Sequence, residues 1–100
     1  MELYQSLSSR FPEALSPLIR SILKECCNNA ENSVNQNVEY AVFLSFKMCI
    51  IQLKAVVEAL SSEADVINLN YDNQTFQISQ NSIHWKQLLL IYDQLKDFDF

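Results

Sequence analysis

The 100-residue sequence contains no glycine, two prolines and a single histidine. Glycine-rich loops hold the phosphates in P-loop proteins and in the dinucleotide-binding fingerprint, and glycine is the usual residue just beyond the C-terminus of a helix. The absence of glycine therefore excludes both standard nucleotide-binding loops. It also requires the helices of this chain to end without their most common cap. We expect no nucleotide ligand and no cofactor.

Basic residues are few as well. Seven Lys and Arg residues against twelve Asp and Glu residues give a net charge of -5. Nucleic-acid binding depends largely on clustered Lys and Arg that neutralise phosphates, and the basic residues here are scattered along the chain. We therefore expect no nucleic-acid partner. The acidic balance leaves one alternative function, a small inhibitor or immunity-type protein whose negative surface occludes a basic site on a target enzyme.

The sequence has three cysteines, and two of them, Cys26 and Cys27, are adjacent. A disulfide between neighbours is strongly strained, and an odd count without framework spacing is typical of reduced thiols inside the cell. The segment from Met1 to Leu7 lacks the positive leading region and the apolar run of a secretory signal. We expect an intracellular, cytoplasmic location, with the nucleus as a second possible compartment.

The sequence offers few candidates for chemistry. A nucleophilic cysteine needs a base, and the one imidazole, His84, falls on the apolar flank of a predicted helix, where a structural role is more common. Cys26, Cys27, Cys49 and His84 are suitable zinc ligands by type, but they lack the paired CxxC or HxxxH spacing of zinc sites. We expect no catalytic residue and no metal, and therefore a protein that is not an enzyme.

The longest apolar segment, residues 38–60, is apolar on two sides when plotted at 100° per residue. One stripe, which we expect to face the core, contains Val38, Val42, Phe46, Cys49, Leu53, Val56 and Leu60, with Ile50 and Val57 at its edge. The second stripe contains Tyr40, Leu44, Met48, Ile51 and Ala55. A helix that is apolar on two faces usually lies between two packing partners.

The second stripe can be buried in two ways: by the rest of this chain, or by a second chain. Small domains bury only about 60% of the surface that their unfolded chains expose, so we take this stripe as the candidate partner-binding site. A membrane span is disfavoured because Lys47 and Lys54 would lie within the bilayer, where a central charge costs about 2.5 to 3.5 kcal/mol. We expect a protein partner or self-association, and no membrane.

Further helices are predicted on both sides of this segment. A short N-terminal helix spans 2–11, and a second helix begins at Ser16-Pro17, where a capping hydroxyl precedes a proline. The apolar stripe of the second helix is Leu18, Ile19, Ile22, Leu23, Cys26 and Ala30, and the Asn-rich segment 28–37 connects it to the central helix. A last helix from about residue 82 carries an apolar face of Trp85, Leu88, Leu89, Tyr92 and Leu95, with Ile91 and Phe98 toward its margin.

The period of the apolar pattern changes to two between residues 66 and 78, which predicts a β-hairpin. A two-residue turn at Asp72-Asn73 pairs Leu69 with Phe76 and places the large apolar groups on one face. The free strand edges make strand addition by an extended peptide an alternative mode of binding. The helical stripes offer more apolar area, so we favour them as the contact surface.

The sequence therefore predicts a fold of the α+β class that is predominantly α, with about three main helices, a short N-terminal helix, and one β-hairpin between the last two helices. Residues 1–100 form a single helical interaction domain, or the N-terminal part of a longer protein. The predicted function is that of a non-catalytic interaction module or subunit that works by helix-mediated association, as a homo- or hetero-oligomer.

Overall fold

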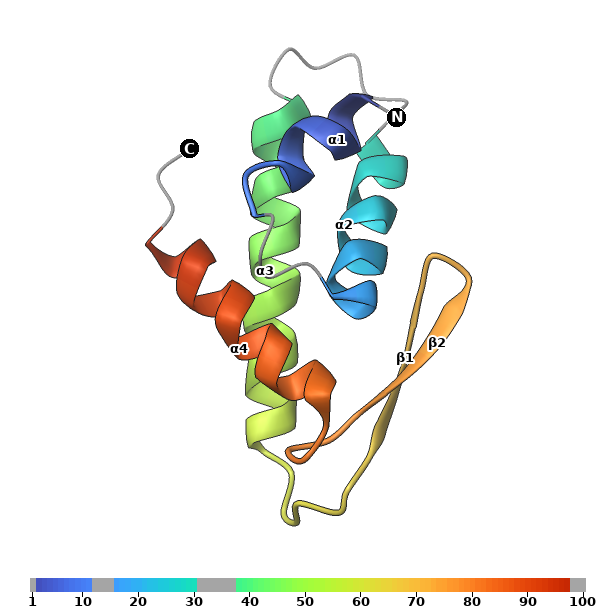
Figure 1. Ribbon diagram of the computed structural model, residues 1–100, viewed down its shortest axis with the longest axis vertical. Coiled ribbons are helices and arrows are strands. Elements are labelled where there is room, and N and C mark those ends of the chain that lie inside the picture. The colour runs from blue at the N-terminus through green and yellow to red at the C-terminus, as the bar shows by residue number, and fades with distance from the viewer. Residues whose placement is uncertain (1, 12–15, 31–37, 98–100) are drawn as a thin grey trace.

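The computed structural model describes residues 2–11, 16–30 and 38–97 (Figure 1). Within these residues the chain forms four helices and one two-stranded antiparallel sheet, in the order α1 Glu2–Ser8, α2 Pro17–Ala30, α3 Val38–Glu58, β1 Ile67–Tyr71, β2 Gln74–Ile78 and α4 Ile83–Lys96. The predicted fold class is confirmed: a mostly helical small domain with a hairpin between α3 and the last helix. The predicted connection at 31–37 and the predicted marginal residue Phe98 lie outside the described residues.

α3 is the central element of the fold. α2 lies along one side of α3 and α4 crosses it on another, while α1 lies across α2 and α3 (Figure 1). The hairpin contacts α2 through β1 and α4 through β2. One apolar core fills the space between these elements and includes residues from every helix and from β2.

Side-chain caps determine where two helices begin. The Ser16 hydroxyl accepts a hydrogen bond from the Ile19 amide at 3.2 Å, and Pro17 occupies the first position of α2, as the sequence predicts. The Ser82 hydroxyl accepts from the Trp85 amide at 3.2 Å at the start of α4. Both caps satisfy amide groups that have no partner within their own helix.

The hairpin has the predicted register, with Ile67 opposite Ile78 and Leu69 opposite Phe76. Asp72 and Asn73 have φ angles of 52° and 60°, the left-handed values that a type I′ turn requires at both central positions. Asp and Asn tolerate this region better than other non-glycine residues. The turn therefore forms in a chain without glycine, and it places the apolar side of the hairpin on the helices.

The core face of α3 differs from the predicted stripe by a small rotation about the helix axis. Its buried residues are Val42, Phe43, Phe46, Ile50, Leu53 and Val57. Val56, predicted at the core, is 48% exposed, whereas Val57, predicted at the edge, is fully buried. Cys49 is only half-buried. A helix that is apolar on both sides has no strong preference for one orientation, so the contacts with α2 and α4 determine which residues face inward.

Smaller corrections apply to the neighbouring helices. In α2 the fully buried thiol is that of Cys27, while Cys26, predicted on the core stripe, packs against the core but is partly exposed. In α4 Ile91 lies at the centre of the buried face, not at its margin, and Leu89 is half-buried. Each correction shifts the buried face by about one residue, which is the precision that periodicity alone allows.

α3 ends without a glycine cap. The side-chain amide of Gln80 donates to the backbone carbonyls of Val57 at 3.1 Å and Leu60 at 3.5 Å. The last carbonyls of a helix have no partner within it and need one from elsewhere. The Val57 carbonyl also accepts from the Leu60 amide at 3.1 Å, so Gln80, more than twenty residues further along the chain, adds a second donor there.

Adjacent valines on α3 test the orientation of the helix. Val57→Ala removes two buried methyl groups and should lower the free energy of unfolding by about 2 kcal/mol. Val56→Ala removes the same atoms from an exposed position and should change it by less than about 0.5 kcal/mol. Urea denaturation followed by circular dichroism measures both. Equal effects of the two substitutions would contradict the orientation of α3.

Candidate functional site

The predicted partner-binding residues Tyr40, Leu44, Met48, Ile51 and Ala55 all lie on the exposed side of α3. The four large side chains are between 37% and 52% exposed, and none of the five belongs to the core. The described part of the chain buries most of the first stripe of α3, Val56 excepted, and leaves the large side chains of the second exposed. We call these five residues the α3 stripe.

The surface around the α3 stripe carries little charge. All exposed residues of α3 from Tyr40 to Val56 are uncharged. Lys47 and Lys54 are half-buried at one edge of the stripe, where each lies over an aromatic ring. The Lys47 Nζ atom is 6.0 Å from the centre of the Phe43 ring, and the Lys54 Nζ atom is 4.7 Å from the centre of the Tyr92 ring. The α3 stripe is thus an apolar surface with cations along one side.

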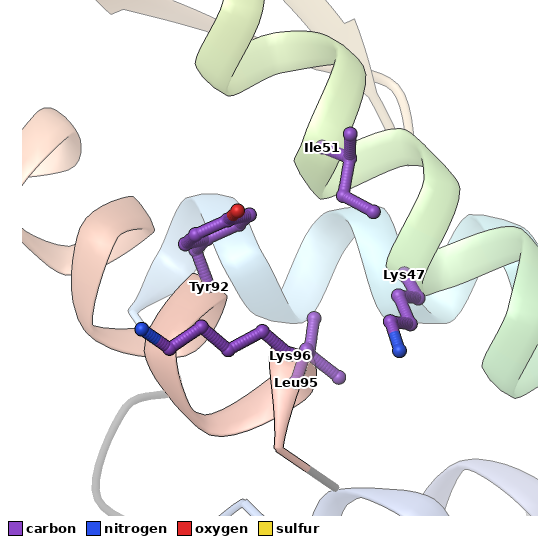
Figure 2. Close-up of a pocket in the computed structure, with 5 residues that line it drawn as sticks. All are labelled: Lys47, Ile51, Tyr92, Leu95 and Lys96. Atoms are coloured by element: carbon purple, nitrogen blue, oxygen red, sulfur yellow. The ribbon is translucent and has the colours of Figure 1, made fainter.

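A pocket of about 130 Å³ adjoins the α3 stripe on this side (Figure 2). α3 contributes Lys47 and Ile51, and α4 contributes Tyr92, Leu95 and Lys96. The volume is roughly four times the ~30 Å³ that one water occupies in the liquid. The pocket extends the apolar surface from α3 toward α4. Periodicity could not reveal it because it forms only where the two helices lie side by side.

The residues considered for catalysis or metal binding occupy structural contacts. The Cys49 thiol lies 3.4 Å from the Tyr71 hydroxyl, at hydrogen-bonding distance for sulfur. The His84 ring meets Phe76 edge-on, with 5.7 Å between ring centres, and its Nδ1 atom is buried without a hydrogen-bond partner in the described chain. Within residues 2–11, 16–30 and 38–97, no group of three His, Cys, Asp or Glu residues is placed to hold a metal ion.

Two thiols, those of Cys26 and Cys49, lie in surroundings that favour the protonated form. Burial raises the pKa of Cys26 to about 12, and the nearby Cys49, Cys27 and Glu25 add to this rise. Burial also raises the pKa of Cys49, although the hydrogen bond with Tyr71 opposes part of the increase. A nucleophilic cysteine needs the opposite, a lowered pKa in an electropositive site. The local chemistry therefore favours structural roles for both thiols.

α3 is long and apolar enough, by length and composition alone, to cross a membrane, and it is the one helix in the described ranges that meets this test. In the most apolar 18-residue stretch of α3, 33% lies buried inside the fold. Core helices of soluble proteins pass the same test. Length and composition therefore do not decide what environment the exposed apolar residues of α3 face.

No protein-family model matches the sequence, and neither a curated protein nor a solved structure matches the chain.

The raised pKa values predict slow thiol chemistry in the folded protein. At pH 8 the Cys26 thiolate fraction should be about one part in 10⁴, so Ellman's reagent should react slowly with the native protein and rapidly after unfolding in guanidinium. Because the folded protein keeps this proton where the unfolded chain loses it, stability should fall as pH rises from about 9 toward 12. Native Cys26 reacting as fast as a free thiol would contradict the burial of this group.

Proposed function

We propose that this chain is a non-catalytic protein–protein interaction module that self-associates through the α3 stripe. The observation that carries the proposal is the uncharged, apolar and exposed face of α3, directly opposite the core. Exposed apolar surface of this kind is a common mark of interaction sites in soluble proteins. An intracellular location remains an expectation from the sequence.

The spacing of the α3 stripe favours a second copy of the same chain as the partner. Tyr40 and Ala55 are fifteen residues apart, Leu44 and Ile51 each lie four residues inside them, and Met48 lies near the centre. The spacing of the stripe is therefore almost the same when it is followed from either end of the helix. Two copies packed antiparallel about a twofold axis near Met48 would place Tyr40 opposite Ala55 and Leu44 opposite Ile51. This arrangement sets the large Tyr40 side chain against the small Ala55 side chain. It also sets Leu44 against Ile51, which is similar in size.

Charge also favours this arrangement. Two copies of a chain with a net charge of -5 repel each other, so a contact between them forms most easily through a surface without carboxylates. The exposed residues of α3 from Tyr40 to Val56 provide such a surface. Lys47 and Lys54 stay at its edge, over the rings of Phe43 and Tyr92, where no charge has to be buried.

The size of the α3 stripe indicates a reversible dimer. At 1.5 Å per residue the stripe is about 22 Å long, and one helix is about 10 Å wide. This footprint is well below the ~800 Å² per partner of a standard stable interface. We therefore expect a dissociation constant in the micromolar range.

Matched leucines test the contact surface. Leu44 lies on the α3 stripe and Leu90 on the outer face of α4, and both are exposed. Because each residue occurs twice in a symmetric dimer, Leu44→Ala should weaken dimerisation by about 2 kcal/mol, roughly 30-fold. Leu90→Ala should leave it unchanged. Sedimentation equilibrium of the purified chain measures both constants, and urea denaturation shows whether each variant remains folded.

Three outcomes would overturn the proposal. A chain that stays monomeric at high micromolar concentration would exclude self-association, and the stripe would then need a different protein as its partner. Dimerisation lost with Asn68→Pro in a folded protein, but kept with Leu44→Ala, would assign the contact to the hairpin edge. Association only with a basic protein, and only at low salt, would favour the acidic-inhibitor alternative.

A size swap tests the antiparallel register. Ala55→Tyr should weaken the dimer because it sets two tyrosines opposite each other, and Tyr40→Ala should weaken it by leaving a gap. The double variant Tyr40→Ala with Ala55→Tyr restores a large residue opposite a small one and should recover most of the affinity. In a parallel dimer each residue faces its own copy, so the double variant would not recover. Sedimentation equilibrium of the four proteins distinguishes the two arrangements.

A further inference from the structure

A second, larger pocket lies away from the α3 stripe, where α1, α2 and β2 meet. Its volume is about 420 Å³, within the roughly 300–1,000 Å³ of small-molecule sites. Tyr4 comes from α1, Gln74 from β2, and the remaining lining residues, Pro17, Arg20, Ser21 and Lys24, come from the first two turns of α2. Apart from Pro17, every residue that lines this pocket carries a hydrogen-bonding side chain.

Among the described residues, neither cation of this pocket forms an ion pair with a carboxylate. The two ion pairs of the described residues, Lys54–Glu58 and Lys96–Asp93, lie elsewhere. Arg20 and Lys24 are four residues apart on one face of α2, a spacing at which like charges repel and lower helix stability. Lys24 also lies over the Tyr4 ring, with 5.3 Å from Nζ to the ring centre. A bound anion would offset the repulsion between these two like charges.

Ser21 adds a hydroxyl from α2. The residue is only 4% exposed and its side chain lines the pocket. The buried unpartnered side-chain atoms of the described chain are Glu25 Oε2 and His84 Nδ1, so the Ser21 hydroxyl is not one of them and opens into the pocket, where a ligand can reach it. The positive end of the α2 dipole lies at the same position, since Pro17 is the first residue of this 14-residue helix. The hydroxyl, the two cations and the helix end therefore offer complementary contacts to one anion.

Tyr4 adds a hydroxyl from α1. Burial raises the pKa of Tyr4, Arg20 opposes the rise, and Cys27 and Asp72 add to it. The hydroxyl therefore stays protonated at neutral pH and can donate a hydrogen bond. The effect of Asp72 also places one negative charge within electrostatic range of the pocket, and this charge should weaken the binding of an anion.

We propose that this pocket binds the phosphate group of a small soluble molecule, with Arg20 and Lys24 as the charged contacts and the hydroxyls of Ser21 and Tyr4 as donors. The site uses no glycine loop, so it differs from both standard nucleotide-binding motifs. Gln74, an exposed residue of the same lining, would contact the part of the ligand that carries the phosphate. This site is separate from the α3 stripe and does not depend on the proposed dimer.

Titration with inorganic phosphate and with phenyl phosphate, at constant ionic strength in sodium chloride, tests the proposal by amide NMR. Saturable shifts should appear at Arg20, Ser21, Lys24 and the Gln74 side chain. Arg20→Gln and Lys24→Gln should each weaken binding by about tenfold, and Ser21→Ala by a smaller factor of about fivefold. Asp72→Asn keeps the size and the left-handed turn and should tighten binding by about twofold to threefold.

Lys86→Gln, which removes an exposed cation from α4, is the matched control and should leave the affinity unchanged. The amide spectrum of each variant without ligand shows that the fold is intact. Linear shifts without saturation, or an equal loss of affinity in Lys86→Gln, would overturn the proposal by showing general attraction to cations. Vesicles of phosphatidylcholine with phosphatidic acid form the second arm. Binding to these vesicles that needs Arg20, without binding to the soluble phosphates, would overturn the assignment to a soluble ligand.

Discussion

The structure depends on the packing of one face of α3 against the rest of the chain. Phe46, Ile50 and Val57 are fully buried along this face, and α1, α2 and α4 all contact the helix. A chain of 100 residues has enough apolar material to cover one face of a 21-residue helix, but the described residues leave the opposite face open. Because the described residues cover only one face of α3, the protein has a single core on that face and an exposed apolar surface on the other. The proposed association depends on this exposed surface.

Local signals in the sequence were sufficient where neighbouring residues determine the structure. The hairpin register follows from an alternation of period two around Asp72-Asn73, and both turn residues tolerate positive φ. The start of α2 follows from Ser16 and Pro17, which act within one turn of the helix. In such places the interaction spans three or four residues, so reading the sequence in order identifies the partners.

The orientation of α3 and the two pockets could not be predicted in the same way. Val56 and Val57 are equally apolar neighbours, and only the positions of α2 and α4 decide which one is buried. The pocket beside Ile51 requires Tyr92 from α4, and the polar pocket requires Tyr4 from α1 and Gln74 from β2. The α3 stripe was found because it lies on a single helix. A site shared by several elements leaves no periodic signal in any of them.

The Gln80 contact has a consequence for the motions of the native protein. Its amide donates to the carbonyls of Val57 and Leu60, in addition to the local backbone bonds from Ala59 to Val56 and from Leu60 to Val57. A glycine cap would form within the helix itself and would let that end fray alone. Here Gln80 joins the end of α3 to the segment that leads into α4, in which Ser79 and Ser82 hydrogen-bond to each other. We therefore expect the end of α3 and the entry to α4 to open together and their amides to exchange at similar rates.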